Sequence, residues 1–317
     1  MRSLKIRWLM VAVLALTALP AAAEQFINIL TGGTSGIYYP LGIGLSNIDS
    51  KALPDAKVSV QATKASVENL NLLEAGRGEA AITLGDSLSQ AWAGVKDAGY
   101  EKPLRDLRGI SAMHANYVQI VARADSGIRT LADLKGKRVS VGAAKSGTEL
   151  NARAVFAAAG LKYSDFSKVE YLPYEQSAQL VQNRQLDVTL QSAGLGNPAL
   201  RDLANNADIV FIPIPPEVIA KIGDAAYADG KIPANTYKGQ TADVPTAKIG
   251  NFLVTRVGVS TDTVYRMTKA MYEHLDELVA AHAAAKSIKL ENAIAGMPIP
   301  LHPGAEKFYR EVGLIKK

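Results

Sequence analysis

The sequence contains no cysteine among its 317 residues. This absence excludes a disulfide framework, a zinc–thiolate site, an iron–sulfur cluster and a cysteine nucleophile. It also excludes a lipoprotein, because a lipid-modified N-terminus requires a cysteine at the cleavage point.

Common enzyme motifs are missing as well. The four histidines, at positions 114, 274, 282 and 302, form neither an H-E-x-x-H motif nor a close metal cluster. There is no G-x-S-x-G elbow, no serine with a lysine three residues later and no G-x-x-x-x-G-K phosphate loop. These absences weigh against an enzyme, and we expect neither a metal nor an organic cofactor.

Composition bounds the class of protein. Hydrophobic residues make up 48% of the chain and charged residues 21%, which excludes a disordered or fibrous protein. At about 100–200 residues per domain, the length predicts about two domains. No cluster of lysine and arginine resembles a phosphate-binding stripe, so the formal charge of +5 does not indicate a nucleic-acid partner.

The first 23 residues have the pattern of a secretory signal peptide. Three basic residues precede an apolar run over 8–19, and Pro-Ala-Ala-Ala at 20–23 allows cleavage after Ala23. The run is shorter than the ~20 residues of a membrane-spanning helix, although an uncleaved anchor is the alternative. We therefore expect a soluble periplasmic protein, whose formal charge falls from +5 to +2 on cleavage.

Short apolar runs alternate with helical patterns along the rest of the chain, which predicts an α/β protein with a largely parallel sheet. Strands are expected over 26–30, 57–62, 80–84, 117–123, 138–141, 169–172, 186–191, 209–212 and 250–254. Helices are expected over 37–48, from Ser66 onward, and over 148–159, 176–184, 261–282 and 303–312. The same order of elements occurs twice, and a strand and helices return at the end. We therefore expect a discontinuous first lobe, 24–116 plus 248–317, around a second lobe, 117–247.

Four polar turns follow expected strands, at 31–36, 63–66, 145–149 and 191–198. Open α/β sheets bind ligands at the carboxyl ends of their strands. Glycines let the backbone approach a ligand, and free N–H groups at a helix start favour an anion. These turns supply the candidate ligand-binding residues: Gly33, Thr34, Tyr38, Lys64, Ser66, Lys145, Ser146, Gly147, Thr148, Gln191 and Ser192.

Several longer segments resemble the TAXI family, the solute-binding subunits of TRAP transporters. They lie at 31–42 (TGGTSGIYYPLG), 66–70 (SVENL), 121–128, 131–139, 146–149 (SGTE), 232–239, 243–246 and 298–306. The resemblance covers essentially the whole chain after the signal segment. It implies a two-lobed, hinged clamp of the periplasmic-binding-protein type (type II-like). It also implies delivery of a small carboxylate to a membrane-embedded TRAP permease by a receptor that we expect to be a monomer.

Two positions depart from the family pattern. Lys64-Ala65 stands where the family commonly has Gly-Gly, and Leu84-Gly85 precedes Asp86 where a glutamine two residues before the aspartate is usual. The first departure places a cation beside the expected cleft, and Lys145 would place another on the opposite lobe. Two cations could hold both ends of a dianion, which predicts a C4–C5 dicarboxylate such as 2-oxoglutarate or malate. The alternative is that both lysines point to solvent.

Three other functions stay open at this point. The same type of receptor could bind glutamate or another amino acid. A periplasmic enzyme could use the same hinged scaffold, since a fold does not determine a function. A receptor for an ABC importer would also share the clamp architecture.

Overall fold

The computed structural model describes residues 25–316, so the expected signal segment, 1–23, lies outside the described residues. Its strands form one mixed sheet in the order β2-β1-β3-β10-β4-β7-β5-β6, with β8 paired to β4 and β9 paired to β10. The strands are β1 (Gln25–Leu30), β2 (Ala56–Gln61), β3 (Ala80–Leu84), β4 (Leu107–Arg123), β5 (Arg138–Ser140), β6 (Lys168–Glu170), β7 (Val188–Ala193), β8 (Ile209–Ile212), β9 (Tyr227–Ile232) and β10 (Val244–Arg256).

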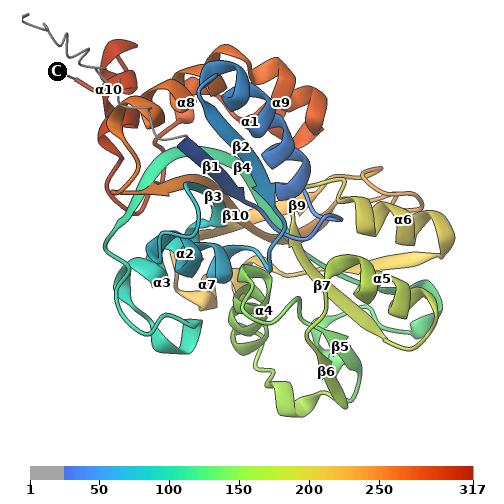
Figure 1. The fold of residues 1–317 in the computed structure, drawn as a ribbon. Coiled ribbons are helices and arrows are strands. Elements are labelled where there is room, and N and C mark those ends of the chain that lie inside the picture. Colours follow the sequence, from blue (N-terminus) through green and yellow to red (C-terminus); the bar gives the residue numbers. More distant parts are fainter. Residues whose placement is uncertain (1–24, 317) are drawn as a thin grey trace, which may run out of the picture.

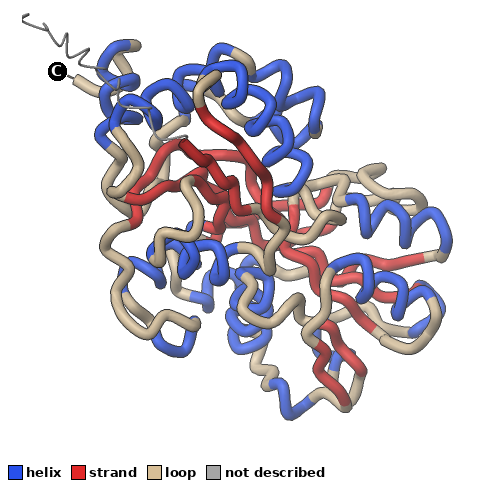
Figure 2. Tube along the Cα trace, in the orientation of Figure 1, coloured by secondary structure: helices blue, strands red, loops and turns tan. Residues whose placement is uncertain are grey.

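Helices cover the sheet on both faces (Figure 2). They are α1 (Tyr38–Ala52), α2 (Ser66–Glu74), α3 (Gly85–Ala93), α4 (Gly147–Ala158), α5 (Tyr174–Gln182), α6 (Pro198–Asn206), α7 (Pro216–Ile222), α8 (Thr261–Glu273), α9 (Leu275–Ala281) and α10 (Pro303–Glu311). Short 3-10 helices lie at Lys96–Ala98, Ala124–Ser126, Leu131–Leu134, Tyr163–Asp165, Ala283–Ser287 and Leu290–Asn292. Within residues 25–316, no helix is both long and apolar enough to span a bilayer.

Two long antiparallel strands, β4 and β10, connect the two parts of the molecule. Residues 107–117 of β4 pair with residues 248–256 of β10, and β10 also pairs with β3. The rest of β4 pairs with β7 and β8, and the rest of β10 pairs with β9. Figure 1 shows β1 and β2 with α1 and α8 in one part, and β5–β7 with α5 and α6 in the other. The expected α/β clamp with a discontinuous first lobe is therefore confirmed as a fold class. The expectation of a largely parallel sheet is wrong, because every pairing of β4 and β10 is antiparallel.

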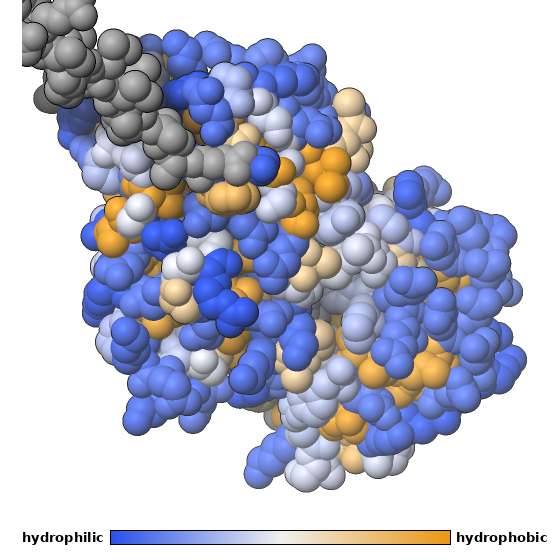
Figure 3. All heavy atoms as spheres, in the orientation of Figure 1, coloured by the Kyte–Doolittle hydropathy of each residue, from blue (hydrophilic) through white to orange (hydrophobic). Residues whose placement is uncertain are grey.

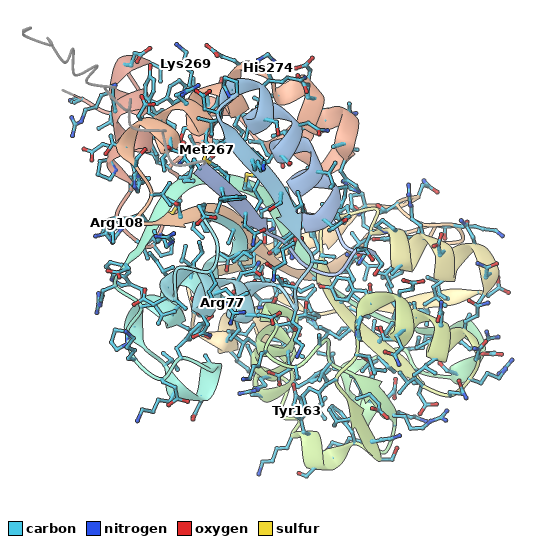
Figure 4. The ribbon with its side chains drawn as sticks, in the orientation of Figure 1. Arg77, Arg108, Tyr163, Met267, Lys269 and His274 are labelled. Atoms are coloured by element: carbon cyan, nitrogen blue, oxygen red, sulfur yellow. The ribbon has the colours of Figure 1, made fainter. Side chains whose placement is uncertain are left out.

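The core follows the same division. One large buried cluster takes its residues from 27–113 and from 253–309, and a second takes them from 118–249 together with Leu84. Leu84 is thus the point at which the second cluster reaches into the first part of the chain. The helical layer over β1 and β2 directs Met267 toward the sheet, while Lys269 and His274 lie on its outer side (Figure 4).

Three expectations from the sequence need correction. The helix expected over 261–282 is divided at His274, where φ is −129° and ψ is 38°. The break lets α9 turn so that Leu278 packs against Gly44 of α1, where an added Cβ would lie 2.9 Å from its Cδ2. The strands expected over 117–123 and 250–254 extend to β4 and β10, because buried polar residues such as Ser111 and Asn116 continue them.

Three helices, α3, α6 and α7, were not expected from the sequence. Turn formers stand at their starts: Gly85-Asp86-Ser87, Asn197-Pro198 and Pro215-Pro216. In α6 these residues start the helix, since the Asn197 side chain accepts a hydrogen bond from the Ala199 backbone N–H at 3.1 Å and proline follows at the first helical position.

Candidate functional site

A cavity of about 120 Å³ lies between the two parts of the molecule. A cavity needs about 10–15 Å³ to hold one water molecule, so this one is large enough for a small solute. The first part contributes the loop before α1, the loop before α2 and Leu84, and the second contributes the loops before α4 and α5 and the end of β7. In Figure 3, residues of intermediate hydropathy cover the surface between these two parts.

Four helices begin at this cavity. The first residues of α1, α2, α4 and α5 are Tyr38, Ser66, Gly147 and Tyr174, and all four line it. The N–H groups of a helix's first turn have no acceptor within the helix, and the helix dipole places partial positive charge at this end. Lys64 also lines the cavity, and no described lining residue carries a carboxylate. The cavity is therefore built to attract an anion.

Hydrogen-bonded side chains from the two crossing strands form the floor. Tyr38 OH donates to Asn251 Oδ1 on β10, and Asn251 Nδ2 donates to Asn116 Oδ1 on β4 at 2.9 Å. Asn116 Nδ2 then donates to the backbone carbonyl of Ser192 on β7 at 2.7 Å. Burial raises the pKa of Tyr38 well above its ordinary value, so its hydroxyl stays protonated and able to donate. The chain of bonds links both parts of the molecule under the cavity.

The wall on the second part is also made of hydroxyl groups. Tyr174 OH donates to the Ser192 carbonyl at 2.7 Å and lies 2.6 Å from Thr148 Oγ1. Burial raises the pKa of Tyr174 to about 12. The Ser192 Oγ is buried and has no hydrogen-bond partner among the described residues. A buried polar atom without a partner is costly unless a ligand or water completes it, so Ser192 Oγ is free to bind a solute.

The two parts touch directly at Gly147. An added Cβ on Gly147 would lie 2.6 Å from Leu84 Cδ1, 2.7 Å from Ser66 Oγ and 3.0 Å from Ser66 Cβ. Ser66 Oγ itself accepts a hydrogen bond from the Leu84 backbone N–H at 3.1 Å. The structure therefore shows the two parts in close contact over the cavity, and only glycine fits at this position of α4.

Most of the residues expected from the sequence lie at the cavity. Eight of them line it: Gly33, Tyr38, Lys64, Ser66, Ser146, Gly147, Thr148 and Ser192. Thr34 is exposed beside the rim and Gln191 is buried behind the wall, where its Nε2 donates to the Tyr174 carbonyl at 3.1 Å. Lys145 is exposed and absent from the lining, so the expectation that it faces Lys64 across the cavity is not met. Its backbone explains this, because Lys145 has a φ of +61° in the turn that precedes α4.

Sequence reasoning missed several lining residues. Asn116 lies in the middle of a long strand, and Pro173 and Tyr174 follow a short one. The signal that could have found Tyr174 is its place after the β6 strand, where a parallel sheet presents its binding edge. Asn116 carries no such signal, because its importance depends on the crossing of β4 and β10.

Ala65 adopts a backbone conformation that favours glycine, with φ of 71° and ψ of −146°. Glycine would adopt this conformation without strain, whereas alanine does not. The surroundings hold Ala65 in place, since its N–H donates to Thr63 Oγ1 at 2.9 Å and Thr63 Oγ1 donates to Asn69 Oδ1 at 2.6 Å.

Replacing this alanine tests the strain. Such a conformation costs about 1–3 kcal/mol for a residue with a side chain, whereas glycine loses about 0.4–1 kcal/mol through its freer unfolded chain. We therefore expect Ala65→Gly to raise the free energy of unfolding by about 1 kcal/mol, measured by urea denaturation. The matched control is Ala144→Gly, an exposed residue without a positive φ, which should destabilise slightly. A destabilised Ala65→Gly would contradict the account of strain.

Comparison with known families identifies the chain. A sequence profile of the NMT1-like family matches residues 29–313, which is nearly all of the described chain. The chain belongs to the NMT1-like family. The cavity of this NMT1-like protein thus lies wholly within the matched segment.

Solved structures agree on the fold. This NMT1-like chain is similar to PhnD1 of Prochlorococcus marinus in complex with methylphosphonate, with a TM-score of 0.58, 11% identity, and 92% of this chain and 100% of that chain covered. A binding component of an ABC phosphonate transporter from Pseudomonas aeruginosa matches with a TM-score of 0.55 and 14% identity over 82% and 79%. A putative L-cystine ABC transporter from Listeria monocytogenes matches at 0.52 and 15% over 84% and 98%. At these identities the likeness concerns the fold alone.

Proposed function

We propose that this protein is a periplasmic receptor that binds a small carboxylate in the cavity between its two lobes and releases it unchanged. One observation carries the proposal: four helix N-termini from both parts of the molecule converge on a cavity whose charged lining residue is Lys64. Fixed N–H groups and hydroxyls bind an anion strongly where water is excluded. The folds of solute-binding proteins, among them one solved with methylphosphonate, support a binding role.

The size and lining of the cavity support a C4–C5 acid such as 2-oxoglutarate or malate, with glutamate as the alternative. One carboxylate would meet Lys64 at the edge of the first lobe. A second carboxylate would meet the start of α4, where Ser146, Gly147 and Thr148 line the opposite wall. In this arrangement the α4 N-terminus takes the place that Lys145 was expected to fill.

We propose lobe boundaries at 24–116 plus 248–317 and at 117–247. The two chain crossings then lie on β4 and β10, whose bonded side chains form the cavity floor. Bending of these strands would open and close the clamp, as hinge motions do in two-lobed proteins. The motifs that resemble the TAXI family support delivery to a TRAP permease, and a monomer suffices because both walls of the cavity come from one chain.

The function is tested by a thermal-shift screen of about a hundred organic acids and amino acids. A ligand that binds only the folded protein raises its stability by about 3–4 kcal/mol at 100–1,000 times its dissociation constant. We expect C4–C5 carboxylates to give the largest shifts and mass spectrometry to recover them unaltered. A screen in which phosphonates or sulfonates stabilise the protein and carboxylates do not would contradict the proposal, and chemical conversion of the acid would favour an enzyme.

Lys64 provides the sharpest single-residue test. Lys64→Met keeps the aliphatic stem and removes the charge, so we expect the affinity for the best acid to fall about tenfold by isothermal titration calorimetry. The effect is moderate because Lys64 is exposed, and solvent screens exposed charges. Lys145→Met is the matched control, because Lys145 lies outside the lining of the cavity. The affinity of this variant for the same acid should equal that of the wild type. A loss of affinity in Lys145→Met together with unchanged affinity in Lys64→Met would contradict this placement of the carboxylate.

A further inference from the structure

A second buried contact, outside the cavity, joins the proposed lobes. Asp86 lies in the first turn of α3, and its Oδ2 accepts hydrogen bonds from Asn151 Nδ2 of α4 at 2.7 Å and from Tyr227 OH of β9 at 2.8 Å. Asp86 and Asn151 are fully buried, and neither lines the cavity. A carboxylate of the first lobe is thus taken out of water by two residues of the second.

This contact lacks a donor. Asp86 Oδ1 and Asn151 Oδ1 are both buried and have no hydrogen-bond partner among the described residues. A proton on Asp86 Oδ1 would remove one buried, unpartnered and charged acceptor from this contact. The closed arrangement therefore suits a neutral Asp86 better than an ionised one.

The groups that face Asp86 do not offset the loss of water. The hydrogen bond from Tyr227 and the nearby backbone N–H groups of Ser87 and Asp86 favour the ionised carboxylate, whereas Asp224 repels it. The other groups near Asp86, the hydroxyls of Tyr38, Tyr100 and Ser87 and the amide of Asn151, are neutral. Burial is the largest effect and raises the pKa of Asp86 to about 6.

We propose that Asp86 is a positioning residue for lobe closure, whose contact with Asn151 and Tyr227 forms as the lobes close and is strengthened when Asp86 carries a proton. The inference rests on the proposed two-lobed receptor. In an open clamp the carboxyl group would face water and regain an ordinary pKa of about 4. Closure then takes up a proton, so the ratio of closed to open protein rises as the pH falls. Between pH 7.5 and 4.5 the expected rise is roughly twentyfold.

The absence of cysteine makes this measurable. Asn47→Cys on α1 and Gln179→Cys on α5 place two dyes at exposed positions of opposite lobes. Single-molecule energy transfer, without added solute, would give the closed fraction from pH 7.5 to 4.5. In the wild-type background we expect the ratio of closed to open protein, calculated from this fraction, to rise roughly twentyfold, and in Asp86→Asn we expect no dependence on pH.

Two further variants complete the design. Tyr227→Phe removes one donor to the ionised carboxylate, so it should lower the closed fraction at pH 7.5 and keep the rise at low pH. Asp229→Asn, an exposed residue on the same strand, is the control and should respond as the wild type does. A closed fraction that does not change with pH, or an Asp86→Asn variant that responds like the wild type, would overturn the inference. The closed fraction is measured without solute, so it can be determined even if no carboxylate binds. The proposal on Asp86 and the proposal on carboxylate binding can therefore be rejected independently.

Discussion

Gly147→Ala is expected to weaken solute binding 30- to 100-fold while leaving the solute-free protein folded. The added methyl group would lie 2.6 Å from Leu84 Cδ1 and 3.0 Å from Ser66 Cβ, both on the opposite lobe. Overpacking of this kind costs about 1–3 kcal/mol, and about 2.0–2.7 kcal/mol corresponds to that loss of affinity. The cost applies only to the closed protein, because alanine is a good residue for the first turn of α4.

Titration calorimetry with the best acid from the screen, together with thermal unfolding of the solute-free variant, would separate the two effects. Gly250→Ala is the matched control, because its added Cβ would meet Phe252 at an ordinary 3.9 Å. It should bind like the wild type. Unchanged affinity in Gly147→Ala would mean that binding does not require the contact between Gly147 and Ser66.

Asp49→Asn is expected to stabilise the protein by about 3–4 kcal/mol at pH 7. Asp49 is 1% exposed in α1, and its Oδ1 has no hydrogen-bond partner among the described residues. Burial raises its pKa to about 8. The native carboxyl group therefore keeps its proton to about pH 8, whereas the unfolded chain releases it above about pH 4.

The sign of the pH dependence follows from this difference. Between about pH 4 and pH 8 the native state binds more protons than the unfolded state, so Asp49 lowers the free energy of unfolding by about 1.4 kcal/mol per pH unit. The increase in the free energy of unfolding caused by Asp49→Asn should thus vanish near pH 4 and reach its full size above pH 8. Denaturation in guanidinium chloride at several pH values checks it, with the exposed Asp55→Asn as control. A gain that is equal at pH 4 and pH 8 would contradict the account.

The parts of the site that follow one another along the chain could be predicted from the sequence. The turns before α1, α2 and α4 carry glycine and hydroxyl residues next to helical patterns, and they line the cavity. Local backbone strain at Lys145 could not be predicted, and it changes which groups reach the cavity. The length of β4 was also missed, because residues such as His114 and Asn116 are polar yet fully enclosed by neighbouring strands.

The parts of the site that could not be predicted depend on contacts between segments that are distant in the sequence. Asn116, Asn251 and Ser192 meet in the floor only because β4, β10 and β7 bring them together. Asp86 has no sequence pattern that indicates its bonds to Asn151 and Tyr227. Such pairings depend on the register of the sheet, which short-range periodicity does not determine.

A crystal structure of the protein with the acid that gives the largest thermal shift tests the central claim most directly. We expect an unaltered acid between the lobes, with one carboxylate near Lys64 and the other groups near the Ser192 hydroxyl and the start of α4. An acid bound outside this cavity, or held by one lobe alone, would contradict it.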